Sequence, residues 1–204
     1  MNTNKIEYII AIDSELCAGA EEIARELSRQ LSIPCYGEEI LDKAAELSGI
    51  SKKLMYRYDG KAVHAAYDLL AEDLNEIKLP SAQAFVSAKV SACQELAKNG
   101  PCILLDRHAS FALKDRCVSI FIHADMEQRA ERFAREHSGE TFKHADKAYK
   151  HYYSTVCRDW GNADHYSLSV NAGGDPAQVA GSILTFLESF AGGQLAGQQH
   201  AKAM

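Results

Sequence analysis

The chain has 204 residues, an apolar fraction of 47% and a formal net charge of -6, so it is long enough to bury a sizeable core. The acidic balance argues against general nucleic-acid binding, which usually accompanies a basic excess. No signal peptide and no apolar run of membrane-spanning length is evident, which predicts a cytoplasmic protein that does not act at membranes.

The first predicted unit is a strand, a tight loop and a helix. The apolar run over 8–12 predicts a buried strand, and apolar residues recur at helical spacing from Ile23 to Leu31. Free backbone N–H groups and the helix dipole make this arrangement suited to binding phosphate. A working phosphate-binding loop also has several glycines, a lysine and a hydroxyl residue for magnesium. Here Gly19 is the only glycine in the turn, and Glu21 and Glu22 open the helix.

The remaining pattern predicts an α/β fold. Strands are expected at 32–36, 101–106, 117–123 and 166–170, and helices at 38–47, after Ser51, and at 61–77, 80–98, 126–137, 141–157 and 176–190. Alternating strands and helices indicate a parallel sheet covered on both faces. We expect one domain over 1–190 with a helical insertion between the second and third strands, followed by a flexible tail at 191–204.

Three loops fall at the carboxyl ends of predicted strands, where ligands bind in such folds. They are residues 13–20, 107–110 and the segment after His123. Arg107 follows a buried strand, and its planar donor group could bind a phosphate there or pair with Asp106. The spacing alone leaves both alternatives open.

Two other segments carry cations. Arg129 and Arg132 share one helix face and could clamp a phosphoryl group, although surface pairs such as Glu131 with Arg135 explain the same pattern. The stretch 146–153 mixes cations with tyrosines, so it could close over a nucleotide or pack its rings on the core. The histidines and the six cysteines show no metal-ligand spacing, and we expect no metal site formed by the protein alone.

These pieces, in this order, resemble the cytidylate-kinase-like family of P-loop nucleoside monophosphate kinases. The family loop I-S-R-E-F-G-S-G-G-R-E-I is similar to the residues from Ile12 to Ile23. V-I-V-G-R-x-A-D-Y-I-L is similar to Ile103 to Leu113, F-I-x-A-x-x-x-x-R-x-x-R is present in full from Phe121 to Arg132, and W-G-x-x-x-x-Y-D-L-x-I-N is similar to Trp160 to Asn171.

The resemblance implies a three-layer P-loop kinase fold with a five-stranded parallel sheet, a helical nucleoside-monophosphate-binding region at 37–100 and a lid at 138–160. It implies phosphoryl transfer to a nucleoside monophosphate or another small acceptor, with ATP and Mg²⁺ if the protein is active. A homo-oligomer is compatible with the sequence. The site residues so implied are Arg107, Arg129 and Arg132 for catalysis; Glu15, Cys17, Ala18, Gly19, Ala20, Glu21 and Glu22 for the nucleotide; and Asp146, Lys147, Lys150 and Tyr153 for the substrate or lid.

The departures from the family pattern concentrate on donors and glycines. Ser14 stands where the family loop has arginine, and Cys17 and Ala20 stand where it has glycine. Glu21 replaces the cation that follows these glycines. The lid pattern D-x-x-R-x-x-Y-Y has Tyr149 in place of its arginine. A Cβ at either former glycine would crowd a phosphate if φ were positive there.

These changes leave two hypotheses open. The chain is an active kinase in which Arg25, Lys147 or Lys150 supplies the missing charge, or it is a catalytically inactive relative that binds a ligand or a protein partner. A redox role for Cys17 is less favoured, because Glu21 and Glu22 oppose the thiolate that a helix N-terminus would stabilise.

Overall fold

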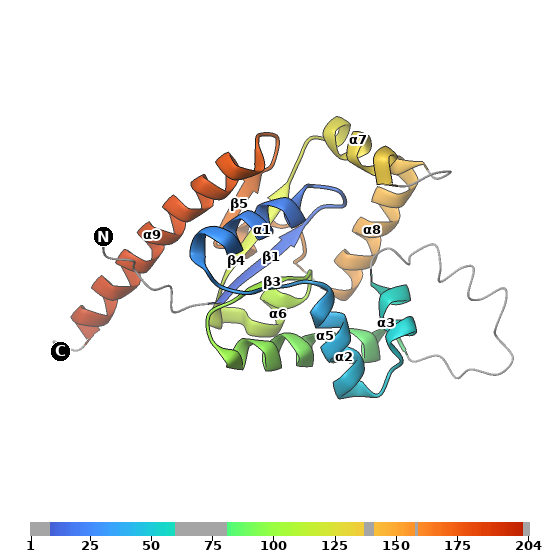
Figure 1. Ribbon diagram of the computed structural model, residues 1–204, viewed down its shortest axis with the longest axis horizontal. Coiled ribbons are helices and arrows are strands. Elements are labelled where there is room, and N and C mark those ends of the chain that lie inside the picture. Colours follow the sequence, from blue (N-terminus) through green and yellow to red (C-terminus); the bar gives the residue numbers. More distant parts are fainter. Residues whose placement is uncertain (1–8, 60–80, 137–140, 158, 202–204) are drawn as a thin grey trace, which may run out of the picture.

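The computed structural model describes residues 9–59, 81–136, 141–157 and 159–201. Figure 1 shows a parallel sheet with helices on both sides. The strands are β1 (Ile9–Ser14), β2 (Cys35–Tyr36), β3 (Ile103–Leu105), β4 (Cys117–His123) and β5 (Leu168–Asn171), in the spatial order β2-β3-β1-β4-β5. The five-stranded parallel α/β sheet predicted from the sequence is therefore confirmed.

β1 lies at the centre of the sheet because its residues are apolar on both faces. Ile10 and Ile12 face α1 (Ala20–Leu31) and α9 (Pro176–Ala201), which pack against each other on one side (Figure 1). Ala11 faces the opposite side, where α2 (Glu38–Ser48), α5 (Ala82–Leu96) and α6 (Ala109–Leu113) form a second core. Successive side chains of a strand point to opposite faces of the sheet, so Asp13, two residues after Ala11, lies on the same face as Ala11.

Three further helices surround the carboxyl ends of the strands. They are α3 (Lys52–Tyr58), α7 (Met126–Glu136) and α8 (Phe142–Val156). Ser51 caps α3 through a hydrogen bond from Leu54 N, as its position before the helix predicts. Figure 1 places α7 and α8 beside the loop that follows β1.

Several boundaries differ from those expected. β2 has two residues rather than five. β5 begins at Leu168, because the backbone N–H groups of Ser167 and Ser119 donate to each other's hydroxyl oxygens instead of to ladder carbonyls. α9 continues beyond Phe190 to Ala201. The helix expected over 61–77 lies outside the described residues. None of the helices that the structure describes is both long and apolar enough to cross a membrane.

Candidate active site

The loop after β1 leads directly into the N-terminus of α1. Gly19 precedes the helix with φ 83°, and within the part of the chain that the structure describes no N-cap side chain bonds to the first turn. A Cβ added at Gly19 would lie 3.1 Å from the Arg132 guanidinium carbon, so the positive φ favours glycine there and any larger residue would displace Arg132 slightly. The uncapped N–H groups of α1 therefore open onto the loop.

The two positions where the family glycines are replaced behave differently. Cys17 has φ 55°, in the left-handed region that favours glycine, so its Cβ stands where the sequence comparison anticipated crowding. Ala20 is the first residue of α1 and is nearly buried, with an ordinary helical backbone. Only the first of the two replacements thus forces a side chain into an unfavourable backbone conformation.

A cavity of about 550 Å³ lies over this loop, and we call it the loop cavity. All residues from Glu15 to Glu22 line it, as do parts of α2, α3 and α8. Among the described residues that line it, three are arginines and seven are carboxylates: Arg25, Arg107, Arg132, Glu15, Glu21, Glu22, Glu38, Glu39, Asp59 and Asp106. The lining is therefore acidic overall, and it disfavours an anion more strongly as the charge of that anion increases.

Arg129 and Arg132 lie three residues apart on α7 but have different surroundings. Arg129 is 2% exposed and bonds to Asp146 (2.5 Å) and to the carbonyl of Ala124, with Glu15 at 3.2 Å. Arg132 donates to the carbonyl oxygens of Cys17 (3.3 Å) and Ala172 (3.4 Å), and it lines the loop cavity. Arg132 therefore faces the cavity, whereas Arg129 connects α7, α8 and the loop.

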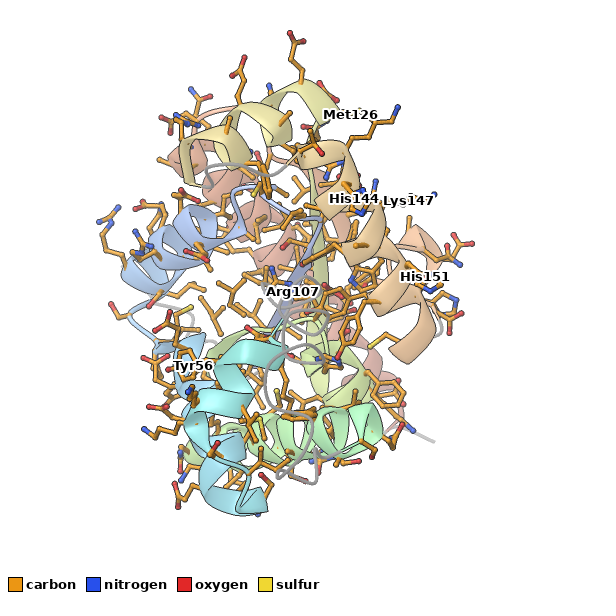
Figure 2. All side chains as sticks on the ribbon, turned by 90° about the vertical axis from the view of Figure 1, so that its right-hand side faces the viewer. Tyr56, Arg107, Met126, His144, Lys147 and His151 are labelled. Atoms are coloured by element: carbon orange, nitrogen blue, oxygen red, sulfur yellow. The ribbon has the colours of Figure 1, made fainter. Side chains whose placement is uncertain are left out.

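Arg107 follows β3 and lies between α8 and the loop, at the centre of the view in Figure 2. Its Nε donates to the Tyr149 hydroxyl at 2.5 Å, and that hydroxyl donates to the carbonyl oxygen of Ser14 at 3.2 Å. Tyr149 is 2% exposed, and burial raises the pKa of its hydroxyl although Arg107 opposes the shift. The residue that replaces the lid arginine thus joins Arg107 to the first loop as a neutral group.

The other residues expected in the lid have three different environments: some contact the loop, one is exposed on the outer surface and one is buried. Lys150 bridges Glu15 and Asp146 at 3.2 Å each, and Asp146 is also the partner of Arg129. Lys147 is exposed on the outer side of α8, together with His144 and His151 (Figure 2). Tyr153 is fully buried, and its hydroxyl has no hydrogen-bond partner among the described residues.

A buried charge cluster under the loop cavity was not anticipated from the sequence. Lys89 of α5, 5% exposed, lies 2.5 Å from Asp59 and 2.6 Å from Asp106, and His108 Nδ1 lies 3.1 Å from Asp106. Burial alone would raise the pKa of the Asp106 carboxyl, but Lys89 and His108 hold it well below its usual range. The available signal was Asp106, which stands where the similar family motif has glycine.

Asp13 is a second group that sequence reasoning missed. It is 1% exposed and accepts hydrogen bonds from Ser14 N (2.8 Å), Trp160 Nε1 (3.0 Å) and the Tyr166 hydroxyl (2.7 Å). Burial raises the pKa of its carboxyl to about 7, in spite of these donors and Arg107. The W-G-x-x-x-x-Y pattern supplies both aromatic partners, and aspartate in place of the family serine was the signal.

The sheet order, the loop at the end of β1 and the surrounding helices define a P-loop kinase-like α/β protein. A model of the cytidylate kinase-like family matches residues 9–173, and the chain belongs to that family. A comparison with proteins of curated function finds no match.

Solved structures share the fold at low sequence identity. An uncharacterized protein from Eubacterium ventriosum is 20% identical, with a TM-score of 0.61 over 90% of this chain and 99% of that one. Shikimate kinase from Acinetobacter baumannii in complex with shikimate is 12% identical, with a TM-score of 0.59 over 91% and 95%. A gluconokinase from Sinorhizobium meliloti is also 12% identical, with a TM-score of 0.57 over 95% and 99%.

Proposed function

We propose that this protein is a ligand-binding member of the cytidylate kinase-like family that no longer transfers phosphoryl groups at the rate of a working kinase. The observation that carries the proposal is the Tyr149 hydroxyl, which lies between Arg107 and the Ser14 carbonyl where the lid pattern has an arginine. Phosphoryl transfer depends on positioned cations around the transferred group. A neutral hydroxyl cannot replace a guanidinium in that role.

The loop residues do not fit a magnesium–triphosphate group. From Glu15 to Glu22 the loop has no lysine, arginine, serine or threonine, and Glu21 and Glu22 stand exposed in the first turn of α1. Each carboxylate would repel a neighbouring phosphate by about 1 kcal/mol even in a water-like dielectric. The uncapped α1 N-terminus and Arg132 still suit a ligand with one anionic group, such as a nucleoside monophosphate or another small phosphorylated molecule.

An active kinase with an unusual loop is the competing function. It is favoured by Arg25, Arg107 and Arg132, which all line the loop cavity. In that case these three side chains would have to neutralise the triphosphate without a loop lysine.

Two measurements on the full chain separate these functions: ADP formation from ATP and Mg²⁺ with CMP as acceptor, and calorimetric titration with CMP and with ATP. We expect CMP to bind more tightly than ATP and no acceptor-dependent ADP above background. Turnover of about 1 s⁻¹ or faster, a rate ordinary for enzymes, would overturn the proposal. Absence of CMP binding would reject its ligand-binding half.

A repaired loop provides a gain-of-function test. The double variant Cys17→Gly with Glu21→Arg relieves the positive-φ side chain and returns a cation to the first turn of α1. We expect it to raise ATP affinity about tenfold or more, since each change removes an obstacle of order 1 kcal/mol. Glu127→Arg, which makes the same charge change in the first turn of α7, is the matched control and should leave ATP affinity unchanged.

A further inference from the structure

A second cavity, of about 610 Å³, lies beside Arg107 and is formed by α6, the turn Lys114–Arg116, the start of β4, Cys157 and residues within 159–167. Its size is in the range of small-molecule sites. Arg107 is the only described residue that lines both this cavity and the loop cavity. The second cavity has no part in the proposed function, which concerns the loop.

Aromatic rings form much of the wall of the second cavity. Phe111, which is 53% exposed, lines the cavity together with Trp160 and Tyr166. Asp13 holds both of these rings by hydrogen bonds, and Phe121 packs behind them with centroid distances of 5.7 and 4.9 Å. Rings fixed in this way can receive a planar ligand without further ordering, which lowers the entropic cost of binding.

Two cations face the same space. Within the described residues, Arg107 uses only Nε in a side-chain hydrogen bond, so its two terminal nitrogens remain as donors. Lys114 lines the cavity with φ 49° and ψ -124°, a backbone conformation that side chains rarely adopt and that tends to persist at functional positions. Four carboxylates of the described residues also line the cavity: Asp13, which is bonded to the two rings, Asp159, which lies 3.4 Å from His165, and Asp115 and Asp164. Their charge disfavours a doubly charged phosphate over a single carboxylate.

We propose that the second cavity binds a planar aromatic carboxylate, with its ring against Phe111 and the Trp160–Tyr166 wall and its carboxylate toward Arg107 and Lys114. A guanidinium matches a carboxylate with paired donors, and a ring pocket excludes water from the contact. This ligand class differs from the phosphorylated molecule proposed for the loop cavity. The two proposals can therefore be tested with different ligands, and failure of one does not decide the other.

Trp160 is the only tryptophan of the chain and lines the second cavity, so its fluorescence reports on binding there. We would titrate the full chain with 4-fluorobenzoate, following Trp160 emission and the ¹⁹F line width, and repeat the titration with 4-fluorobenzyl alcohol. We expect saturable one-to-one binding of the acid, about tenfold tighter than that of the neutral alcohol because a charged hydrogen bond is lost in the alcohol.

Variants locate the site. Phe111→Ala and Lys114→Gln change partly exposed side chains, so both should fold, and each should weaken 4-fluorobenzoate binding about fivefold to tenfold. The matched controls Leu47→Ala and Lys52→Gln lie outside the cavity and should leave affinity unchanged. No saturable signal up to about 10 mM, or binding that both cavity variants leave intact, would overturn the proposal. Equal affinity for the acid and the alcohol would reject the role of the cations.

Discussion

The two walls of the loop cavity are built in different ways. The wall from α7 and α8 is joined to the loop by Arg129 with Asp146, Lys150 with Glu15, and Tyr149 with Ser14. The wall from α1 presents Glu21 and Glu22, which are exposed and make no ion pair among the described residues. The first wall is part of the interior, so changes there should affect stability, whereas changes in the second should affect ligand binding.

The largest expected effect is that of Arg129→Met. This change leaves the buried carboxylate of Asp146 with only Lys150 as a cationic partner. Loss of one partner of a buried ion pair typically costs about 3–5 kcal/mol, so we expect a fall of that size in the free energy of unfolding measured with urea.

The same substitution at two other positions of α7 serves as a control. Arg135→Met changes an exposed residue and should alter stability by less than about 0.5 kcal/mol. Arg132→Met should cost about 1 kcal/mol but weaken CMP binding, because that side chain lies over Gly19. Equal stability losses at 129 and 132 would contradict the distinction between an interior and a cavity-facing arginine.

The buried carboxyl of Asp13, in β1, predicts a pH dependence of stability. Its pKa is raised by burial to about 7, so the folded state holds a proton that the unfolded state releases near pH 4. The native state then binds more protons than the unfolded state, and stability falls as pH rises from about 4 to 7, by up to about 4 kcal/mol.

Asp13→Asn should remove this dependence while keeping an acceptor for Ser14 N and Trp160. The free energy of unfolding of both proteins, measured with urea at pH 5 and pH 8, checks the prediction. If the difference between the two pH values is the same in the variant, another group is responsible for it.

The sequence was informative about the fold and less so about contacts within the site. Apolar strands that alternate with helices predicted the parallel sheet, because continuously apolar strands are buried on both faces and helices cover those faces in a parallel sheet. The loop and Arg107 were placed at the strand ends for the same reason. The pairings of Asp13 with Trp160 and of Lys89 with Asp106 join positions that are distant in the chain. The spacing of residues within one segment does not predict such pairings.

Tyr149→Phe tests the hydroxyl that joins the two sides of the site. Removing it leaves the Ser14 carbonyl and the Arg107 Nε without this partner, which should cost about 1–3 kcal/mol of unfolding free energy. Tyr153→Phe is the matched control, because its buried hydroxyl has no partner among the described residues and its removal should be neutral or stabilising. A comparable loss in both variants would contradict the distinction between a bonded hydroxyl at Tyr149 and an unbonded one at Tyr153.

The smallest effect is expected in the loop itself. Cys17→Gly removes a side chain at φ 55°, a gain that the greater freedom of glycine in the unfolded chain partly offsets, so stability should change by less than about 1 kcal/mol. Gly19→Ala should instead lose at least about 1 kcal/mol, because φ is 83° and the new Cβ would press on Arg132. Thermal unfolding of the two variants checks this contrast. A large loss in Cys17→Gly would show that the cysteine supports the loop, and the loop would then belong to the interior wall.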